Sequence, residues 1–132
     1  MSNARIPMVD TDVWIDFLRG TKQALTFVDQ LPHRVAISSI SIGELYAGVR
    51  DGVESDALSN LLDTLDVLEL NRDIAQSGGL IRRDFSKSHG VGLNDALIAA
   101  TAAHCNACLY TLNLKHYPSL DAKQVLKAYR KS

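Results

Sequence analysis

Apolar and polar positions along the chain alternate between strand-like and helix-like patterns. Short apolar runs indicate buried strands at residues 6–9, 35–38, 67–70 and 107–111. Between these runs, apolar residues recur at helical spacing. Such alternation favours a single α/β domain whose central, mostly parallel sheet has four to five strands and is flanked by helices.

Helical periodicity predicts six helices, at 13–19, 22–30, 41–51, 57–65, 72–87 and from Asn94 or Asp95 to about Asn106. In the fourth of these, one buried face is marked by Leu58, Leu61, Leu62 and Leu65. The last, "NDALIAATAAHC", is apolar nearly all round, so we expect burial on most sides. Asn106 is suited to end it because Asn tolerates the left-handed backbone conformation.

Length and composition limit the classes of protein. The chain has 132 residues, of which 46% are hydrophobic, which suits one domain, expected at residues 5–132. Ser2, Asn3 and Ala4 resemble a cloning remnant, so residues 1–4 are left out. No apolar run approaches the ~20 residues of a membrane span, and no signal peptide is recognisable. We therefore expect a soluble, cytoplasmic protein.

Charge and cysteine content add two expectations. The net charge is −1, so no overall positive field indicates nucleic-acid binding, and a polyanion would have to be held locally. Cys105 and Cys108 form a C-x-x-C pair, but a structural zinc site needs four ligands and the sequence has no second pair. Two small core residues in a reducing cytoplasm are the expected role.

Four residues with metal-capable oxygens stand at comparable places: Asp10, Glu44, Asp95 and Asn113. Each has a purely structural interpretation. Asp10 or Asp12 can cap the first helix, Ser41 and Glu44 fit a capping box, and Asp95 suits a helix N-terminus. Together they indicate more, because a parallel sheet gathers strand carboxyl ends at one edge and clustered carboxylates repel without a cation. Oxygen ligands favour Mg²⁺ or Mn²⁺.

Four stretches then give a resemblance: "VDTDVWIDFLRG", "ISSISIGELYAGV", "GLNDALIAATA" and "CLYTLNLKHY". In this order they resemble the PIN-domain ribonucleases and, within them, the VapC-type toxins of bacterial toxin–antitoxin pairs. The resemblance spans residues 6–117. It implies that Asp10, Glu44 and Asp95 bind Mg²⁺, or Mn²⁺ in its place, and that Asn113 stands where many members have a fourth acid. It also implies an RNA substrate, a cognate antitoxin protein and a homodimer.

Further candidates surround these four. Three hydroxyl residues are candidates to orient carboxylates or waters: Thr11, Ser39 and Thr111. Three basic residues are candidates for phosphate contact, with solvated surface as the alternative: Arg19, Lys115 and His116. Five apolar residues suit either the core or a groove that holds an antitoxin peptide: Trp14, Ile15, Phe17, Leu45 and Tyr46.

Two other functions remain open on sequence alone. "VDTDV" also fits haloacid-dehalogenase-type phosphatases, in which Asp10 would be a nucleophile and Asp12 an acid, although Asp95 opens a helix here. A non-enzymatic receiver-like signalling domain has a similar length and an acidic pair after its first strand. The chain lacks the Asp after a central strand and the late Lys-Pro that such a domain would have.

Overall fold

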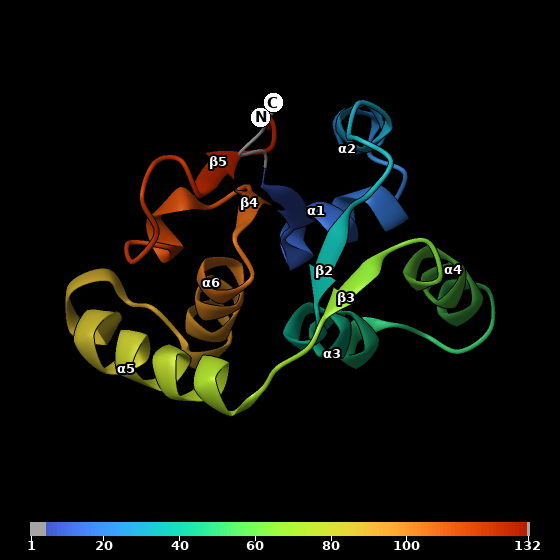
Figure 1. Cartoon of the computed structure of the whole chain (residues 1–132). Helices are drawn as coiled ribbons and strands as arrows, with labels where there is room; N and C mark the ends of the chain where they lie inside the picture. The colour runs from blue at the N-terminus through green and yellow to red at the C-terminus, as the bar shows by residue number, and fades with distance from the viewer. Residues whose placement is uncertain (1–4, 132) are drawn as a thin grey trace.

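The computed structural model describes residues 5–131, so the predicted cloning remnant lies outside the described residues. Its centre is a parallel five-stranded sheet of order β3-β2-β1-β4-β5 (Figure 1). The strands are β1 (Ile6–Val9), β2 (Ala36–Ser38), β3 (Asp66–Leu68), β4 (Ala107–Thr111) and β5 (Val125–Lys127). This confirms the predicted α/β class and the predicted mostly parallel sheet.

Helices cover both faces of the sheet. They are α1 (Thr11–Leu18), α2 (Lys22–Asp29), α3 (Ser39–Gly48), α4 (Val53–Leu62), α5 (Arg72–His89) and α6 (Leu93–His104), with a 3₁₀ turn, η1 (Leu114–His116). In Figure 1, α5 and α6 lie together on one side of the sheet, and α2 and α4 lie on the other. Strands buried on both faces need continuous apolar sequence, which explains the short apolar runs.

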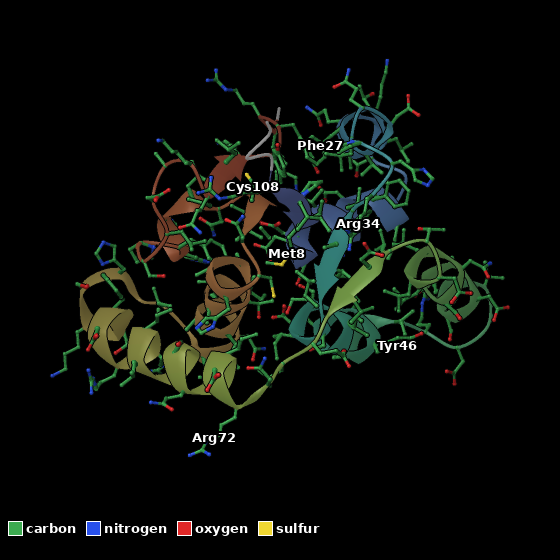
Figure 2. All side chains as sticks on the ribbon, in the orientation of Figure 1. Met8, Phe27, Arg34, Tyr46, Arg72 and Cys108 are labelled. Carbon is green, nitrogen blue, oxygen red and sulfur yellow. The ribbon has the colours of Figure 1, made fainter. Side chains whose placement is uncertain are left out.

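Two core clusters lie on opposite faces of the sheet because successive strand residues point in opposite directions. Met8 joins the cluster that includes Ile98 of α6, whereas Val9 joins the cluster that includes Trp14 of α1 and Leu58 of α4. Figure 2 shows Met8 inside the fold and Arg72 pointing away from it at the start of α5. The predicted buried face of α4 is confirmed at Leu58, which is fully buried.

Several element boundaries differ from prediction. Helix α4 begins at Val53 rather than Ala57, and its first turn is supported by Glu54, which accepts a hydrogen bond from the Arg50 backbone N–H at 3.0 Å. Helices α1 and α3 each begin two residues early, and α6 begins at Leu93. Asn106 does adopt a left-handed conformation, with φ of 52°, at the end of α6.

The helices and the two cysteines can be compared with the expectations for membrane spans and metal sites. No helix within residues 5–131 combines the length and apolar character needed to cross a membrane. Cys105 and Cys108 are both free thiols. Cys108 is buried in β4, which agrees with the expected core role, whereas Cys105 is only half-buried.

Candidate active site

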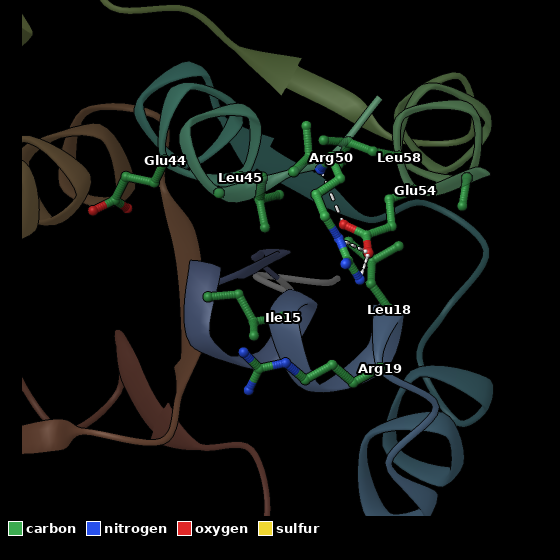
Figure 3. A pocket seen from close by; sticks show the side chains of 11 residues that line it. Ile15, Leu18, Arg19, Glu44, Leu45, Arg50, Glu54 and Leu58 are labelled. Atoms are coloured by element: carbon green, nitrogen blue, oxygen red, sulfur yellow. Dashed lines mark hydrogen bonds and ion pairs between the residues drawn. The ribbon is translucent and has the colours of Figure 1, made fainter. Parts of the chain in front are cut away.

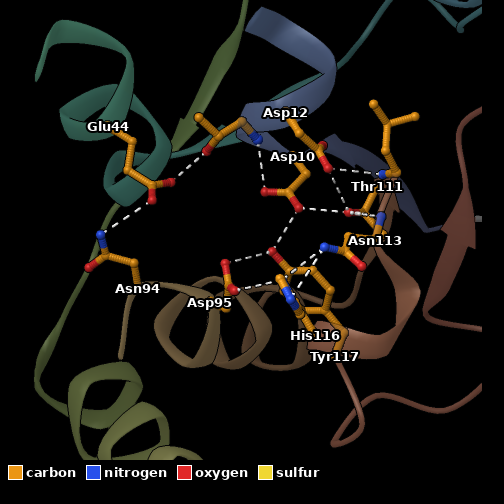
Figure 4. Close-up of polar contacts among 11 residues, drawn as sticks. Asp10, Asp12, Glu44, Asn94, Asp95, Thr111, Asn113, His116 and Tyr117 are labelled. Carbon is orange, nitrogen blue, oxygen red and sulfur yellow. Dashed lines mark hydrogen bonds and ion pairs between the residues drawn. The ribbon is translucent and has the colours of Figure 1, made fainter. Parts of the chain in front are cut away.

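The four predicted site residues lie around one edge of the sheet, where β1 and β4 end (Figure 4). Asp10 directly follows β1 and is the N-cap of α1, so its carboxylate Oδ1 accepts the Thr11 backbone N–H at 2.8 Å. Its Oδ2 accepts hydrogen bonds from Thr111 Oγ1 at 2.8 Å and from Tyr117 Oη at 2.7 Å. Asp10 is therefore anchored from three sides, by β4, α1 and the segment after η1.

Burial governs the electrostatics of Asp10, which is only 6% exposed. Desolvation and the neighbouring carboxylate of Asp12 raise the pKa of Asp10 to about 7, while the hydrogen bonds from Tyr117 and Thr111 oppose that rise. The pKa of Asp12 is also raised by burial, and its Oδ2 accepts the Leu112 backbone N–H at 3.2 Å. Asp10 and Asp12 thus lie next to each other in a poorly solvated environment.

Glu44 reaches this edge from α3. Its Oε1 accepts a hydrogen bond from Thr11 Oγ1 at 2.7 Å, and its Oε2 accepts one from Asn94 Nδ2 at 3.3 Å. The predicted capping box is wrong, because Ser38 is the N-cap of α3 and Glu44 lies in the second turn. Ser41 instead lies with its Oγ 2.8 Å from Thr11 Oγ1, so its hydroxyl serves a contact between helices.

Asp95 lies in the first turn of α6, as predicted, and both of its oxygens face the segment after β4. Oδ1 lies 3.3 Å from Tyr117 Oη, and Oδ2 lies 3.1 Å from His116 Nδ1. Burial raises the pKa of Asp95, and the charge of Glu44 adds to that rise, while His116 opposes it. The carboxylates of Glu44 and Asp95 therefore lie close enough for the charge of Glu44 to affect the pKa of Asp95.

Asn113 joins the site indirectly. Its backbone N–H donates to Thr111 Oγ1 at 3.1 Å, and this same hydroxyl donates to Asp10. Its side-chain Nδ2 lies 3.2 Å from the His116 ring, which contacts Asp95. Asn113 is therefore connected to both acids through one intermediate residue each.

The supporting residues divide into those at the site and those elsewhere. Thr11, Thr111 and His116 contact the carboxylates as described. Ser39 does not, because its Oγ accepts the Leu70 backbone N–H at 3.1 Å beyond the end of β3. Lys115 is exposed in η1.

Tyr117, which links Asp10 and Asp95, was not predicted. "TLNLKHY" contains it, but an aromatic residue after an apolar strand usually signals core packing. Tyr117 does pack in the core, among the residues around Met8, and only its hydroxyl reaches the acids. Asn94, which holds Glu44 from 50 residues away, was missed for a similar reason, since its position suggests only a helix start.

The donor set fits a hard divalent cation in its chemistry. Its charged groups are carboxylates, and within residues 5–131 no Lys or Arg forms an ion pair with Asp10, Glu44 or Asp95. In the observed arrangement, no three His, Cys, Asp or Glu side chains among those residues converge closely enough to hold an ion. The acids instead contact hydroxyl and amide groups that lie between them.

A cavity of about 500 Å³ opens beside the site, between α1, α3 and α4 (Figure 3). Its apolar lining residues include Ile15, Leu45 and Leu58, and Arg19 also lines it. Glu44 lies at one end of the cavity and an ion pair between Arg50 and Glu54 lies at the other. The cavity therefore leads from an apolar surface to an acid of the site.

Two of the residues predicted for a peptide groove, Trp14 and Phe17, do not line the cavity and pack in the core instead. Trp14 is fully buried and packs edge-on against Phe17, with ring centroids 5.5 Å apart. Tyr46 is exposed but does not line the cavity. Of the five residues predicted for a peptide groove, only Ile15 of α1 and Leu45 of α3 line the cavity.

Comparisons with known proteins agree with this architecture. The model of the PIN domain family matches residues 8–117. Ribonuclease VapC19 of Mycobacterium tuberculosis is 36% identical over 115 residues, which are 84% of this chain and 91% of that protein. Ribonuclease VapC10 of the same organism is 36% identical over 117 residues, which are 86% of this chain and 87% of that protein.

A solved structure shows the same fold. The toxin–antitoxin complex from Klebsiella pneumoniae superposes with a TM-score of 0.80 at 26% identity, covering 95% of this chain and 99% of that one. The phosphatase and receiver alternatives are therefore set aside. The chain belongs to the PIN-domain family and, within it, to the VapC ribonucleases.

Proposed function

We propose that this protein is the toxin of a toxin–antitoxin pair, a metal-dependent endoribonuclease that hydrolyses phosphodiester bonds of RNA in the cytoplasm. The observation that carries the proposal is that Asp10, Glu44 and Asp95 lie around one end of the sheet, linked through Thr11 and Tyr117, and that no Lys or Arg among the described residues neutralises them. The similarity to proteins named Ribonuclease VapC19 and VapC10 supports the choice of RNA as substrate.

PIN-domain ribonucleases generally depend on a divalent metal ion. We propose Mg²⁺ for this chain, with Mn²⁺ as a substitute, held by Asp10 and Asp95 and, directly or through water, by Glu44. When bound, such an ion supplies charge that lowers the pKa of water and offsets the negative charge of the attacked phosphate. A positive centre in an acidic pocket also allows a polyanion to approach.

The chain's own residues divide the remaining work. Glu44 has the longest side chain of the three acids, and its oxygens are held by Thr11 and Asn94, so it is suited to accept a proton from the attacking water. Thr111 steadies Asp10 from β4. His116 is half-buried next to Asp95, where its outer edge can contact the phosphate of a bound strand.

The cavity between α1, α3 and α4 is suited to the antitoxin. We propose that an apolar antitoxin segment lies against Ile15 and Leu45 and extends toward Glu44, where it blocks substrate. The Klebsiella pneumoniae relative was solved as a toxin–antitoxin complex, which supports a protein partner. A homodimer that presents two sites remains part of the proposal.

Cleavage assays test the proposal. Purified protein incubated with RNA should break internal bonds with Mg²⁺ or Mn²⁺ and stop with EDTA. Asp95→Asn should abolish cleavage, whereas Asp73→Asn, which changes an exposed acid in the first turn of α5, should not. Retention of EDTA-sensitive cleavage in Asp95→Asn would show that the assigned site is wrong.

Growth assays test the partner. Expression of this chain should arrest growth, and co-expression of the neighbouring small open reading frame should relieve that arrest. Arrest that persists while the second protein is soluble and co-purifies would argue against inhibition by it. Mapping of RNA ends in the arrested cells identifies the RNA that is cut.

A further inference from the structure

Tyr117 has two parts with different surroundings. The residue is only 2% exposed, and its side chain packs in the core cluster of Met8, Ile98 and Leu120. Its backbone N–H donates to Leu114 O at 3.0 Å, which ties the residue to the end of η1. The core requires only an apolar ring at this position, yet the side chain carries a hydroxyl, which needs partners when buried.

The partners of that hydroxyl are two of the proposed metal ligands. Tyr117 Oη donates to Asp10 Oδ2 at 2.7 Å and lies 3.3 Å from Asp95 Oδ1 (Figure 4). A phenol carries one proton, and the shorter distance assigns it to Asp10. Because the ring is fixed in the core, the hydroxyl is a rigid reference point between β1 and α6.

The two oxygens of Asp10 are occupied unequally. Oδ2 accepts two hydrogen bonds, from Thr111 and Tyr117, whereas Oδ1 accepts one, from the Thr11 backbone N–H. A carboxylate oxygen has two lone-pair sites, so Oδ2 is saturated and Oδ1 retains one site. The hydroxyl of Tyr117 therefore determines which Asp10 oxygen remains available.

We propose that Tyr117 is a positioning residue of the metal centre, whose hydroxyl holds Asp10 Oδ2 so that Oδ1 is presented to the ion. The inference rests on the proposed function, since it takes Asp10 as a ligand. Groups that hold a ligand without touching the metal change affinity by on the order of 10–100-fold when removed. Tyr117 needs no contact with RNA for this role.

Tyr117→Phe tests the inference because it removes one oxygen and keeps the ring. Calorimetric titration of the metal-free protein with Mn²⁺ should show binding on the order of 10–100-fold weaker than in the wild type. Cleavage by the variant should recover when Mn²⁺ is raised by the same factor. A purely structural role would instead reduce activity at every Mn²⁺ concentration.

A matched control lies elsewhere in the fold. Tyr129 Oη donates to Asp16 at 2.7 Å, so Tyr129→Phe also deletes a tyrosine-to-carboxylate hydrogen bond but leaves Asp10 untouched. Its Mn²⁺ affinity should equal that of the wild type. Thermal melting of both metal-free variants confirms that each is folded before titration.

The outcomes separate this inference from the proposed function. If the wild type binds Mn²⁺, Asp10→Asn does not, and Tyr117→Phe binds as tightly as the wild type, the positioning role is wrong and the metal site stands. If Tyr129→Phe weakens binding as much as Tyr117→Phe does, the effect is general and the positioning role is also wrong. If Asp10→Asn binds Mn²⁺ normally, the metal site itself is wrong.

Discussion

Asp10→Asn should stabilise the metal-free protein even though it abolishes activity. Burial and Asp12 raise the pKa of Asp10 from 3.8 to about 7. One pKa unit corresponds to 1.36 kcal/mol, so ionised Asp10 lowers the free energy of unfolding by about 4 kcal/mol above pH 7. The amide of Asn would face the hydroxyls of Thr111 and Tyr117, which must reorient, so we expect a net gain on the order of 1–3 kcal/mol at pH 8.

The pH dependence gives the sign of this effect. Because the folded-state pKa of Asp10 is raised, its protonation favours the folded state fully below pH 3.8, and this stability is lost as the pH rises through about 7. The wild type should therefore lose stability relative to Asp10→Asn between pH 5 and pH 8, by on the order of 2–3 kcal/mol. The comparison with the variant cancels the titrating groups that do not interact with Asp10, whereas Asp12, which does interact with it, contributes to the difference.

Urea denaturation in EDTA, at pH 5 and at pH 8, measures both quantities. The reasoning is refuted if Asp10→Asn is less stable than the wild type at pH 8, or if the difference between the two proteins is the same at both pH values. Mg²⁺ provides a check at pH 8. At 100 times its Kd, it should stabilise the wild type by about 2.7 kcal/mol and leave the variant unchanged.

Three further predictions concern the other site residues and one helix contact. Glu44→Gln should nearly abolish RNA cleavage while calorimetry still detects Mn²⁺ binding, because an amide cannot take a proton from water. Asn113→Ala should slow cleavage on the order of 10–100-fold, and Asn113→Asp should keep or improve it at low Mg²⁺, as measured by initial rates. Gly78→Ala should lower the free energy of unfolding by about 1–3 kcal/mol in urea, because its Cβ would lie 3.1 Å from the Leu97 Cα; Gly79→Ala, facing open space, should not.

The strands whose ranges were predicted most closely lie in the buried centre of the sheet. β1 and β4 coincide with their predicted ranges because each is a continuous apolar run in the centre of the sheet. β5, Val125–Lys127, was missed because it has three residues and lies at the sheet edge, where Leu126 and Lys127 are exposed. An edge strand forms partly because it pairs with a neighbouring strand, and the local sequence pattern holds no information about that pairing.

The sequence predicts a site residue when its position relative to the neighbouring strand or helix is enough to locate it. Asp10 and Asp95 follow a strand and open a helix, and parallel topology brings such places together. Local order failed for Ser41, because "SSIS" offers three serines as helix caps and the tertiary contact with Thr11 uses Ser41. Tyr117 depends on a contact across 107 residues, which no pattern near it records.

Asp10 shows why a structural and a functional interpretation need not compete. From sequence, an N-cap and a metal ligand are alternative explanations of an Asp after a strand, yet Asp10 has extended cap dihedrals and also contacts Thr111 and Tyr117. The cap bond uses one lone pair of Oδ1, and the two hydroxyls use Oδ2, so the cap holds the carboxylate without consuming its last acceptor site. An Asn or Ser would cap α1 equally well. Only a carboxylate adds negative charge to this buried position, at a cost in stability that the proposed divalent ion would offset. Capping does not require that charge, so the charge is what the proposed metal-binding role explains.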